Sequence, residues 1–196
     1  MTTAPPPPRA VVGTAALAAL AVPARFALLS HLLAAGPRTA SQCSDVVGES
    51  ASNCSWHLRA LAAVGLVERA PPPAGTDART RLWQAAAVGF EFGGESGPAA
   101  AVARRVIEGL STEHEDHLHR RYLSREADLP ASWVNAAASN SYAVRVTAGE
   151  LTALVAAIDA LLRPFVVPVR TDGPAGSEVA HLTLRAFLHP DLTSER

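Results

Sequence analysis

The stretch SASNCSWHLRALAAVGLV, residues 50–67, carries the strongest structural signal in this chain. Ser50 is a good N-cap, because its hydroxyl can accept a hydrogen bond from a free amide of the first helical turn. Gly65 is a good terminator, because glycine readily adopts the left-handed conformation that ends many helices. We therefore predict a helix over residues 50–64, followed at once by a strand over residues 66–69.

The two faces of this helix differ in chemistry. At 3.6 residues per turn, the inward face is predicted to hold Ala51, Cys54, Leu58, Leu61 and Gly65. The other positions are small, polar or planar near the helix N-terminus, which suits entry into the major groove of DNA, about 12 Å wide. The contacts predicted from this helix are Ser52, Asn53, Ser55, Trp56 and Arg59. An asparagine can read adenine, and an arginine can reach guanine or a phosphate.

The flanking sequence supplies the other parts of a winged helix-turn-helix. Thr39 is a good N-cap for a helix through Val47, and Gly48 provides the turn before the next helix. Downstream, strands over 66–69 and 80–84 enclose a Pro- and Ala-rich loop and predict a β-hairpin. This wing, about residues 66–84, carries three arginines that can hold flanking phosphates: Arg69, Arg79 and Arg81.

Hydrophobic periodicity predicts further elements on both sides of this motif. Helices are expected over residues 10–21, 23–35, 97–125 and 148–162, and strands over 140–146 and 178–187. Thr147 and Glu150 form a capping box for the helix at 148–162. The fold class is therefore mainly α with a small β content. An N-terminal winged helix-turn-helix is followed by a long helix and a small α+β C-terminal part.

Three regions follow from this pattern. Residues 1–9, with four consecutive prolines, are predicted to be a disordered tail. Residues 10–92 form the predicted DNA-binding domain. Residues 93–196 form a C-terminal region for dimerisation, which can also hold an effector site. Its long helix has an apolar stripe that needs a partner.

The run from Ser50 to Val67 resembles the ArsR-type winged helix-turn-helix regulators. Their recognition-helix pattern falls here on Ser50, Ser55, His57, Leu58, Leu61, Gly65, Leu66 and Val67. Upstream, Pro23, Arg25, Leu28, Leu29 and Leu32 resemble the opening helix of the family. The resemblance covers roughly residues 11–90.

The resemblance implies a homodimer that presents two recognition helices to a palindromic operator, usually as a repressor. An unidentified small-molecule effector is a further expectation. Metal sensors of this family commonly carry a Cys-x-Cys pair on the preceding helix. The corresponding stretch, Ser41–Asp45, holds a single thiol, Cys43, which argues against thiolate metal sensing. Cys43 and Cys54 are predicted to be core residues.

Charge and composition agree with a cytoplasmic DNA-binding protein. Residues 1–92 hold seven arginines against five acidic residues, whereas residues 93–196 hold ten against thirteen. The apolar run at residues 10–24 superficially resembles a signal peptide. It is too short to span a bilayer as a helix, and Arg25 and His31 interrupt its continuation, so we predict no membrane association.

Two alternative functions remain from the sequence. A winged helix can serve as a protein–protein interaction module without DNA binding. The run HEDHLH, residues 114–119, can support a metal-responsive variant through His114 and His117. Its spacing does not match the His-Glu-x2-His pattern of zinc proteases, and neither a phosphate-binding glycine loop nor a nucleophile elbow is present. We therefore predict no enzyme activity and no cofactor.

Overall fold

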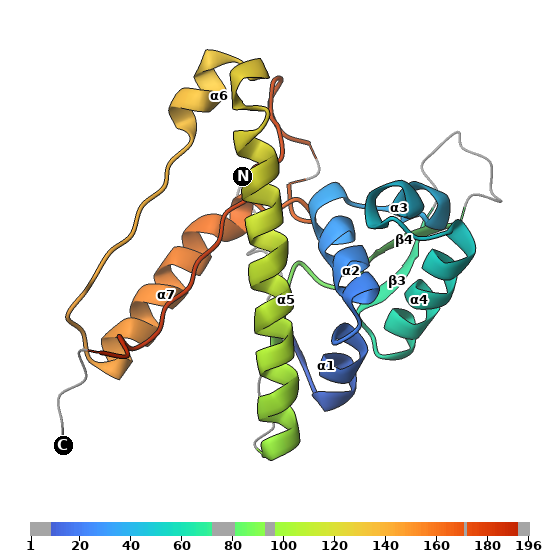
Figure 1. The fold of residues 1–196 in the computed structure, drawn as a ribbon, viewed down its shortest axis with the longest axis horizontal. Coiled ribbons are helices and arrows are strands. Elements are labelled where there is room, and N and C mark those ends of the chain that lie inside the picture. The colour runs from blue at the N-terminus through green and yellow to red at the C-terminus, as the bar shows by residue number, and fades with distance from the viewer. Residues whose placement is uncertain (1–8, 72–80, 93–96, 171, 192–196) are drawn as a thin grey trace, which may run out of the picture.

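The computed structural model describes residues 9–71, 81–92, 97–170 and 172–191. The chain is mainly helical with a small sheet, which confirms the predicted fold class. The long helix α5 (Pro98–Leu123) stands between two groups of elements (Figure 1). On one side lie α1 (Thr14–Leu20), α2 (Pro23–Ala35), α3 (Ala40–Val47) and α4 (Ala51–Ala63); on the other lies α7 (Ala148–Leu162).

Local hydrogen bonds set the bounds of α3 and α4, as predicted. The Thr39 hydroxyl accepts from the Gln42 amide at 3.2 Å, and the Ser50 hydroxyl accepts from the Asn53 amide at 3.2 Å. Gly48 has a φ of 73°, so the turn between the helices uses a left-handed conformation that favours glycine. Gly65 ends the second helix in the same way, with a φ of 74°.

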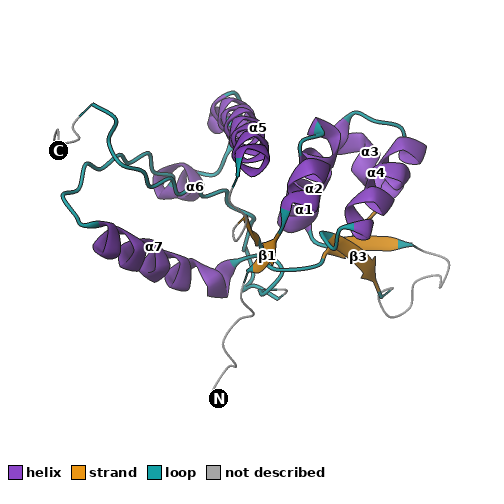
Figure 2. Cartoon of the chain, turned by 90° about the horizontal axis from the view of Figure 1, so that it is seen from below, coloured by secondary structure: helices purple, strands orange, loops and turns teal. Residues whose placement is uncertain are grey.

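The predicted wing hairpin is present and gains a third strand. β3 (Val67–Ala70) and β4 (Leu82–Ala85) are antiparallel, and the short β2 (Arg38–Thr39) pairs with the other edge of β4. The sheet lies beneath α2 and α4 in Figure 2. The predicted loop tip lies mostly outside the described residues, and Arg79 lies outside them altogether.

One core holds the helix-turn-helix and the sheet together. Of the residues predicted to face inward from α4, Cys54, Leu58 and Leu61 are fully buried. Ala51, the first residue of the helix, and Gly65, which follows its end, are exposed instead. The buried cluster also includes Leu17, Leu20, Leu28, Leu32, Cys43, Leu66, Trp83 and Ile107. The side chains that orient α4 therefore come from α1, α2, α3, the sheet and α5.

The N-terminal helix predicted over residues 10–21 is wrong at its start. Residues 10–12 form β1 (Ala10–Val12), which pairs in parallel with β5 (Phe90–Phe92), and α1 begins only at Thr14. Two β-branched valines favour the extended backbone, and a strand from the end of the domain supplies the ladder. That partner lies about 80 residues away and left no local signal.

The two C-terminal strand predictions are also wrong. Residues 140–146 and 178–187 are coil, and no described strand pairs with either. Their alternating pattern satisfies the local requirement for a strand, but a ladder also needs an adjacent backbone, which neither segment has in the described chain. The helix predicted between them is correct, and its capping box forms as α7 begins.

Short elements that the sequence did not reveal follow the long helix. A 3-10 turn, η1 (Glu126–Asp128), leads into α6 (Ala131–Ala136), and a second, η2 (Arg163–Phe165), ends α7. The Asp159 carboxylate on α7 accepts from Arg163 at 2.5 Å and from Arg9 at 3.0 Å, which ties α7 to the start of the described chain.

Within the described residues, no single helix has the length and apolar character needed to cross a membrane. Only α1 and α2 taken together meet that standard, and they are bent by 100° at their junction. The proline-rich tail predicted at residues 1–9 lies outside the described residues except for Arg9.

Candidate nucleic-acid interface

The outward face of α4 is open to solvent at most of the positions that the sequence singled out. Ser52, Asn53, Trp56 and Arg59 are exposed, whereas Ser55 is half-buried. Their inward counterparts fix the helix to the core, so this row of side chains is held in a defined orientation. A helix with such a face can enter a groove without rearranging its own domain.

Asn53 makes a hydrogen bond that the sequence analysis did not anticipate. Its side-chain amide donates to the Glu49 carboxylate at 3.0 Å, one turn earlier. Both groups are exposed, so a base edge can compete for the Asn53 amide with a small loss of energy. Glu49 therefore belongs to the same surface as the predicted contact residues. It also places one negative charge at the helix N-terminus.

Trp56 is the centre of a small cluster between α2 and α4. Its ring packs edge-on against His57, with centroids 4.9 Å apart, and the Arg25 guanidinium lies 5.2 Å from the Trp56 centroid. Trp56 nevertheless remains 56 % exposed, and His57 is half-buried. The indole is thus steadied on one side and open on the other, where an apolar group can meet it.

Three arginines from two elements gather beside this face. Arg59 lies on α4, Arg69 on β3, and Arg81 just before β4. The pKa of Arg69 is lowered, first by burial and then by the positive charges of Arg81 and Arg59, so both of these groups lie close enough to act on Arg69 electrostatically. Within the described residues, none of them forms an ion pair. The fold thus concentrates positive charge that lacks a carboxylate partner.

Arg69 is held more firmly than an exposed arginine usually is. Its guanidinium lies 3.6 Å from the ring centroid of Trp83, the residue directly opposite on β4. Such a cation–π contact restricts the side chain while leaving its N–H groups free to donate. Trp83 was not predicted as part of the site. An aromatic residue paired across a hairpin from an arginine is the signal that could have identified it.

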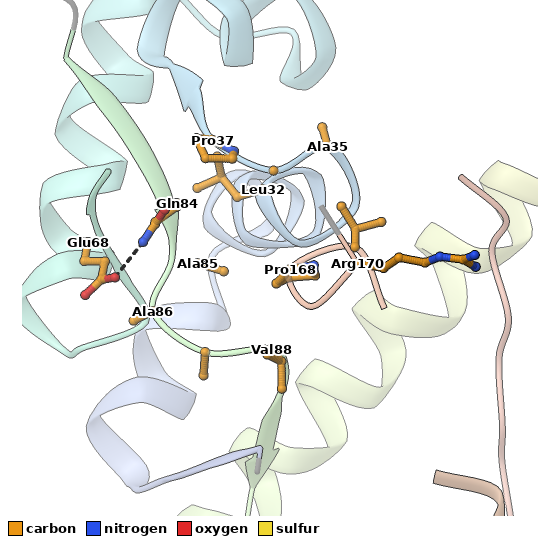
Figure 3. Close-up of a pocket in the computed structure, with 13 residues that line it drawn as sticks. Leu32, Ala35, Pro37, Glu68, Gln84, Ala85, Ala86, Val88, Pro168 and Arg170 are labelled. Atoms are coloured by element: carbon orange, nitrogen blue, oxygen red, sulfur yellow. Dashed lines mark hydrogen bonds between the residues drawn. The ribbon is translucent and has the colours of Figure 1, made fainter. Parts of the chain in front are cut away.

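A separate open cavity of about 560 Å³ lies on the opposite side of the wing sheet. Its walls come from the end of α2, from β3 and β4, from residues 86–88, and from residues 167–170. Figure 3 shows two charged side chains at its edge: Glu68, whose carboxylate accepts from Gln84 at 2.7 Å, and Arg170, which extends away from it. Few polar groups therefore converge on it, unlike a specific ligand site.

The two cysteines are fully buried, as predicted, on the adjoining helices α3 and α4. Burial and the nearby Cys54 raise the pKa of the Cys43 thiol to about 11, against a smaller lowering by Arg38. Burial, and then Glu49, raises the pKa of Cys54 as well. Both thiols are therefore neutral at pH 7 and are poor nucleophiles or metal ligands.

We expect neither thiol to react with a disulfide reagent in the native protein at pH 8, and both to react in denaturant. The Cys43 pKa is higher in the folded state than its ordinary value of 9.0. The unfolded chain therefore loses this proton first, and stability should fall as the pH rises from about 9 towards 11. Absorbance of the released reagent measures the reaction, and a Cys54→Ala variant isolates Cys43. Stoichiometric labelling of native protein within minutes would contradict this expectation.

The histidine-rich run on α5 does not form a metal site by itself. His114 is half-buried and packs edge-on against Phe26 at 5.9 Å, whereas His117 and His119 are exposed. Burial, followed by the positive charges of His181 and His117, lowers the pKa of His114. In the part of the chain that the structure describes, no group of three or more metal-ligating side chains comes together.

The comparison with known families agrees with the geometry. A family model described as a helix-turn-helix domain matches residues 20–70, which span the end of α1 through β3. This domain supports a DNA-binding regulator in general and a winged helix-turn-helix type in particular. The match covers about a quarter of the chain and leaves α5 and the residues after it unassigned. No curated protein matches the chain.

Proposed function

We propose that this chain is a cytoplasmic transcriptional repressor of the ArsR-like type that binds a palindromic operator as a homodimer. The α4 helix enters the major groove with Ser52, Asn53, Ser55, Trp56 and Arg59 towards the bases and backbone. The wing arginines, Arg69, Arg79 and Arg81, hold the flanking phosphates. An effector, if one binds, changes the spacing between the two recognition helices.

The observation that carries this proposal is the arginine cluster beside the open face of α4. Burial, and then the positive charges of Arg81 and Arg59, lowers the pKa of Arg69, and none of the three guanidinium groups has a carboxylate partner among the described residues. A phosphate backbone relieves that repulsion and releases counterions when it binds. A protein-interaction module has no comparable need for unpaired positive charge next to a helix of small polar residues. This difference favours DNA over a protein partner.

The direct test is fluorescence anisotropy with duplexes taken from upstream of this protein's own gene. We expect salt-dependent, sequence-selective binding that Arg59→Ala weakens about tenfold or more, because each lost arginine contact costs about 1–3 kcal/mol. The slope of log affinity against log salt should fall by roughly one for each lost phosphate contact. Arg104→Ala, a change of the same charge at an exposed position on α5, is the matched control.

Two outcomes would separate the alternatives. Absence of duplex binding by the folded protein at low salt would favour the protein-interaction module. Binding in which Arg59→Ala and Arg104→Ala behave alike would mean that general charge, rather than the α4 face, attracts DNA.

A further inference from the structure

The C-terminal part of the described chain has no buried core. Ile107 on α5 is the last residue that is buried, and every later described residue is at least partly exposed. Large apolar side chains are nevertheless frequent there, and many are more than half exposed. They include Tyr142, Val144, Leu161, Phe165, Val179, Leu182, Phe187 and Leu188. Soluble proteins rarely leave so much apolar surface open, so this half is incomplete as a single copy.

The open surface is concentrated on two extended segments, residues 140–146 and 178–188. In the first, Tyr142, Val144 and Val146 occupy alternate positions, and in the second Leu182, Leu184 and Leu188 do so. Alternation of this kind places the apolar side chains of a strand on one face. The two segments lie on either side of α7 in Figure 1, and α7 joins them in the chain.

The backbones of these segments are as open as their side chains. No backbone–backbone hydrogen bond joins residues 140–146 or 178–188 to any other described residue. Each segment thus presents a row of free N–H and C=O groups, which is the property of a strand edge that pairs with another chain.

The second segment is anchored along its other set of alternate positions. Arg185 forms an ion pair with Glu115 on α5, and His181 lies close enough to His114 to influence it electrostatically. Two polar side chains of the segment, Arg185 and His181, therefore lie towards α5, while Leu182 and Leu184 remain 68 % and 47 % exposed. This arrangement fixes the segment in place and keeps its apolar positions outward.

We propose that these two segments pair with the same segments of a second copy of this chain, forming an intermolecular sheet that covers the C-terminal half. The six large apolar side chains at these alternate positions present on the order of 500 Å² of apolar surface. A standard stable interface buries about 800 Å² per partner, and the exposed Leu154 and Leu161 of α7 add further apolar surface in the C-terminal half.

A second copy suits this surface better than a different protein. Between residues 182 and 188, and between 142 and 146, the alternate positions that would meet carry no charge, so two identical faces can approach there without opposing like charges. A two-fold dimer also brings two copies of each segment to the interface. The free N–H and C=O groups of one copy can then pair with those of the other. The inference rests on the homodimer of the proposed function and names the segments that form its interface. It does not depend on whether the homodimer binds DNA.

The test combines light scattering with hydrogen exchange on the full-length protein, without DNA. We expect a mass near twice the single-chain value of 20.4 kDa. We also expect amides in 140–146 and 178–188 to exchange at least about a hundredfold more slowly than in an open coil. The variant Leu182→Asp with Leu184→Asp should return the mass to about 20.4 kDa and remove the protection.

The controls make each result decisive. Val46→Asp changes an equally exposed valine on α3 and should leave the mass and the protection unchanged. Far-UV circular dichroism should show that both variants keep their helices. A wild-type monomer, a dimer whose two segments exchange freely, or a double variant that remains dimeric would each overturn the proposal. A monomer that binds DNA would overturn the interface and the homodimer but leave DNA binding standing, whereas a dimer without duplex binding would overturn DNA binding but leave the interface standing.

Discussion

Leu58→Ala is expected to destabilise the protein by about 3 kcal/mol, the largest effect on folding among the changes considered. Leu58 is 0 % exposed at the middle of α4, where it packs into the cluster shared by the helices and the sheet. Removing a buried leucine side chain loses its transfer free energy and leaves a cavity, at a combined cost of 2–5 kcal/mol. For a chain of this length, 3 kcal/mol corresponds to a melting temperature lower by roughly 6–12 °C.

Urea unfolding followed by circular dichroism measures this loss. Val46→Ala is the matched control, because Val46 lies on the neighbouring α3 and is 57 % exposed. It should change the free energy of unfolding by less than about 0.5 kcal/mol. A loss below about 1 kcal/mol for Leu58→Ala would mean that the face of α4 towards the core is assigned wrongly.

Ser52→Glu is expected to weaken DNA binding strongly while leaving the fold intact. Ser52 is exposed at the second position of α4, where a carboxylate interacts favourably with the helix dipole by about 0.3–1 kcal/mol. In the major groove the same carboxylate would meet phosphates and base acceptors. Like charges brought together at an interface cost several kcal/mol. We therefore expect affinity for the duplex to fall by on the order of a hundredfold.

Ser52→Glu should stabilise α4 slightly and weaken DNA binding, so the experiment separates a loss of affinity from a loss of folding. A thermal melt should show Ser52→Glu at or above wild-type stability, and anisotropy should show the lost affinity. Ala63→Glu adds the same charge at an exposed position in the last turn of α4 and should bind nearly as wild type does. Equal losses in both variants would indicate a general charge effect. Unchanged binding by Ser52→Glu would remove the N-terminal face of α4 from the interface.

The helix-turn-helix could be predicted because its determinants are local. Thr39 and Ser50 cap their helices through hydrogen bonds to amides three residues away, and Gly48 and Gly65 end them in the left-handed region. The 3.6-residue period alone placed Cys54, Leu58 and Leu61 on the buried face. Such signals lie within one or two turns of the residues they affect, so no tertiary contact is needed to interpret them.

The site was predicted less completely than the fold. The sequence pointed to the exposed row on α4 and to the wing arginines as candidates. It could not show that Arg69 lies over Trp83, that Arg59 and Arg81 influence it, or that Glu49 holds Asn53. Except for the contact between Glu49 and Asn53, these relations join residues more than nine positions apart. The register of β3 against β4 decides which residue lies opposite Arg69, and the packing of α4 on the sheet decides that Arg59 lies near it.

What the sequence by itself determined is therefore the order and ends of the main helices, the wing hairpin and the polar face of α4. Only the tertiary structure decided where strands form outside the wing hairpin, because a strand is completed by a neighbouring backbone rather than by its own pattern. Residues 10–12 became a strand because β5 lies beside them, although the sequence there predicted a helix. Residues 140–146 and 178–187 have the pattern of strands and remain coil, because the described chain offers no edge for them to join.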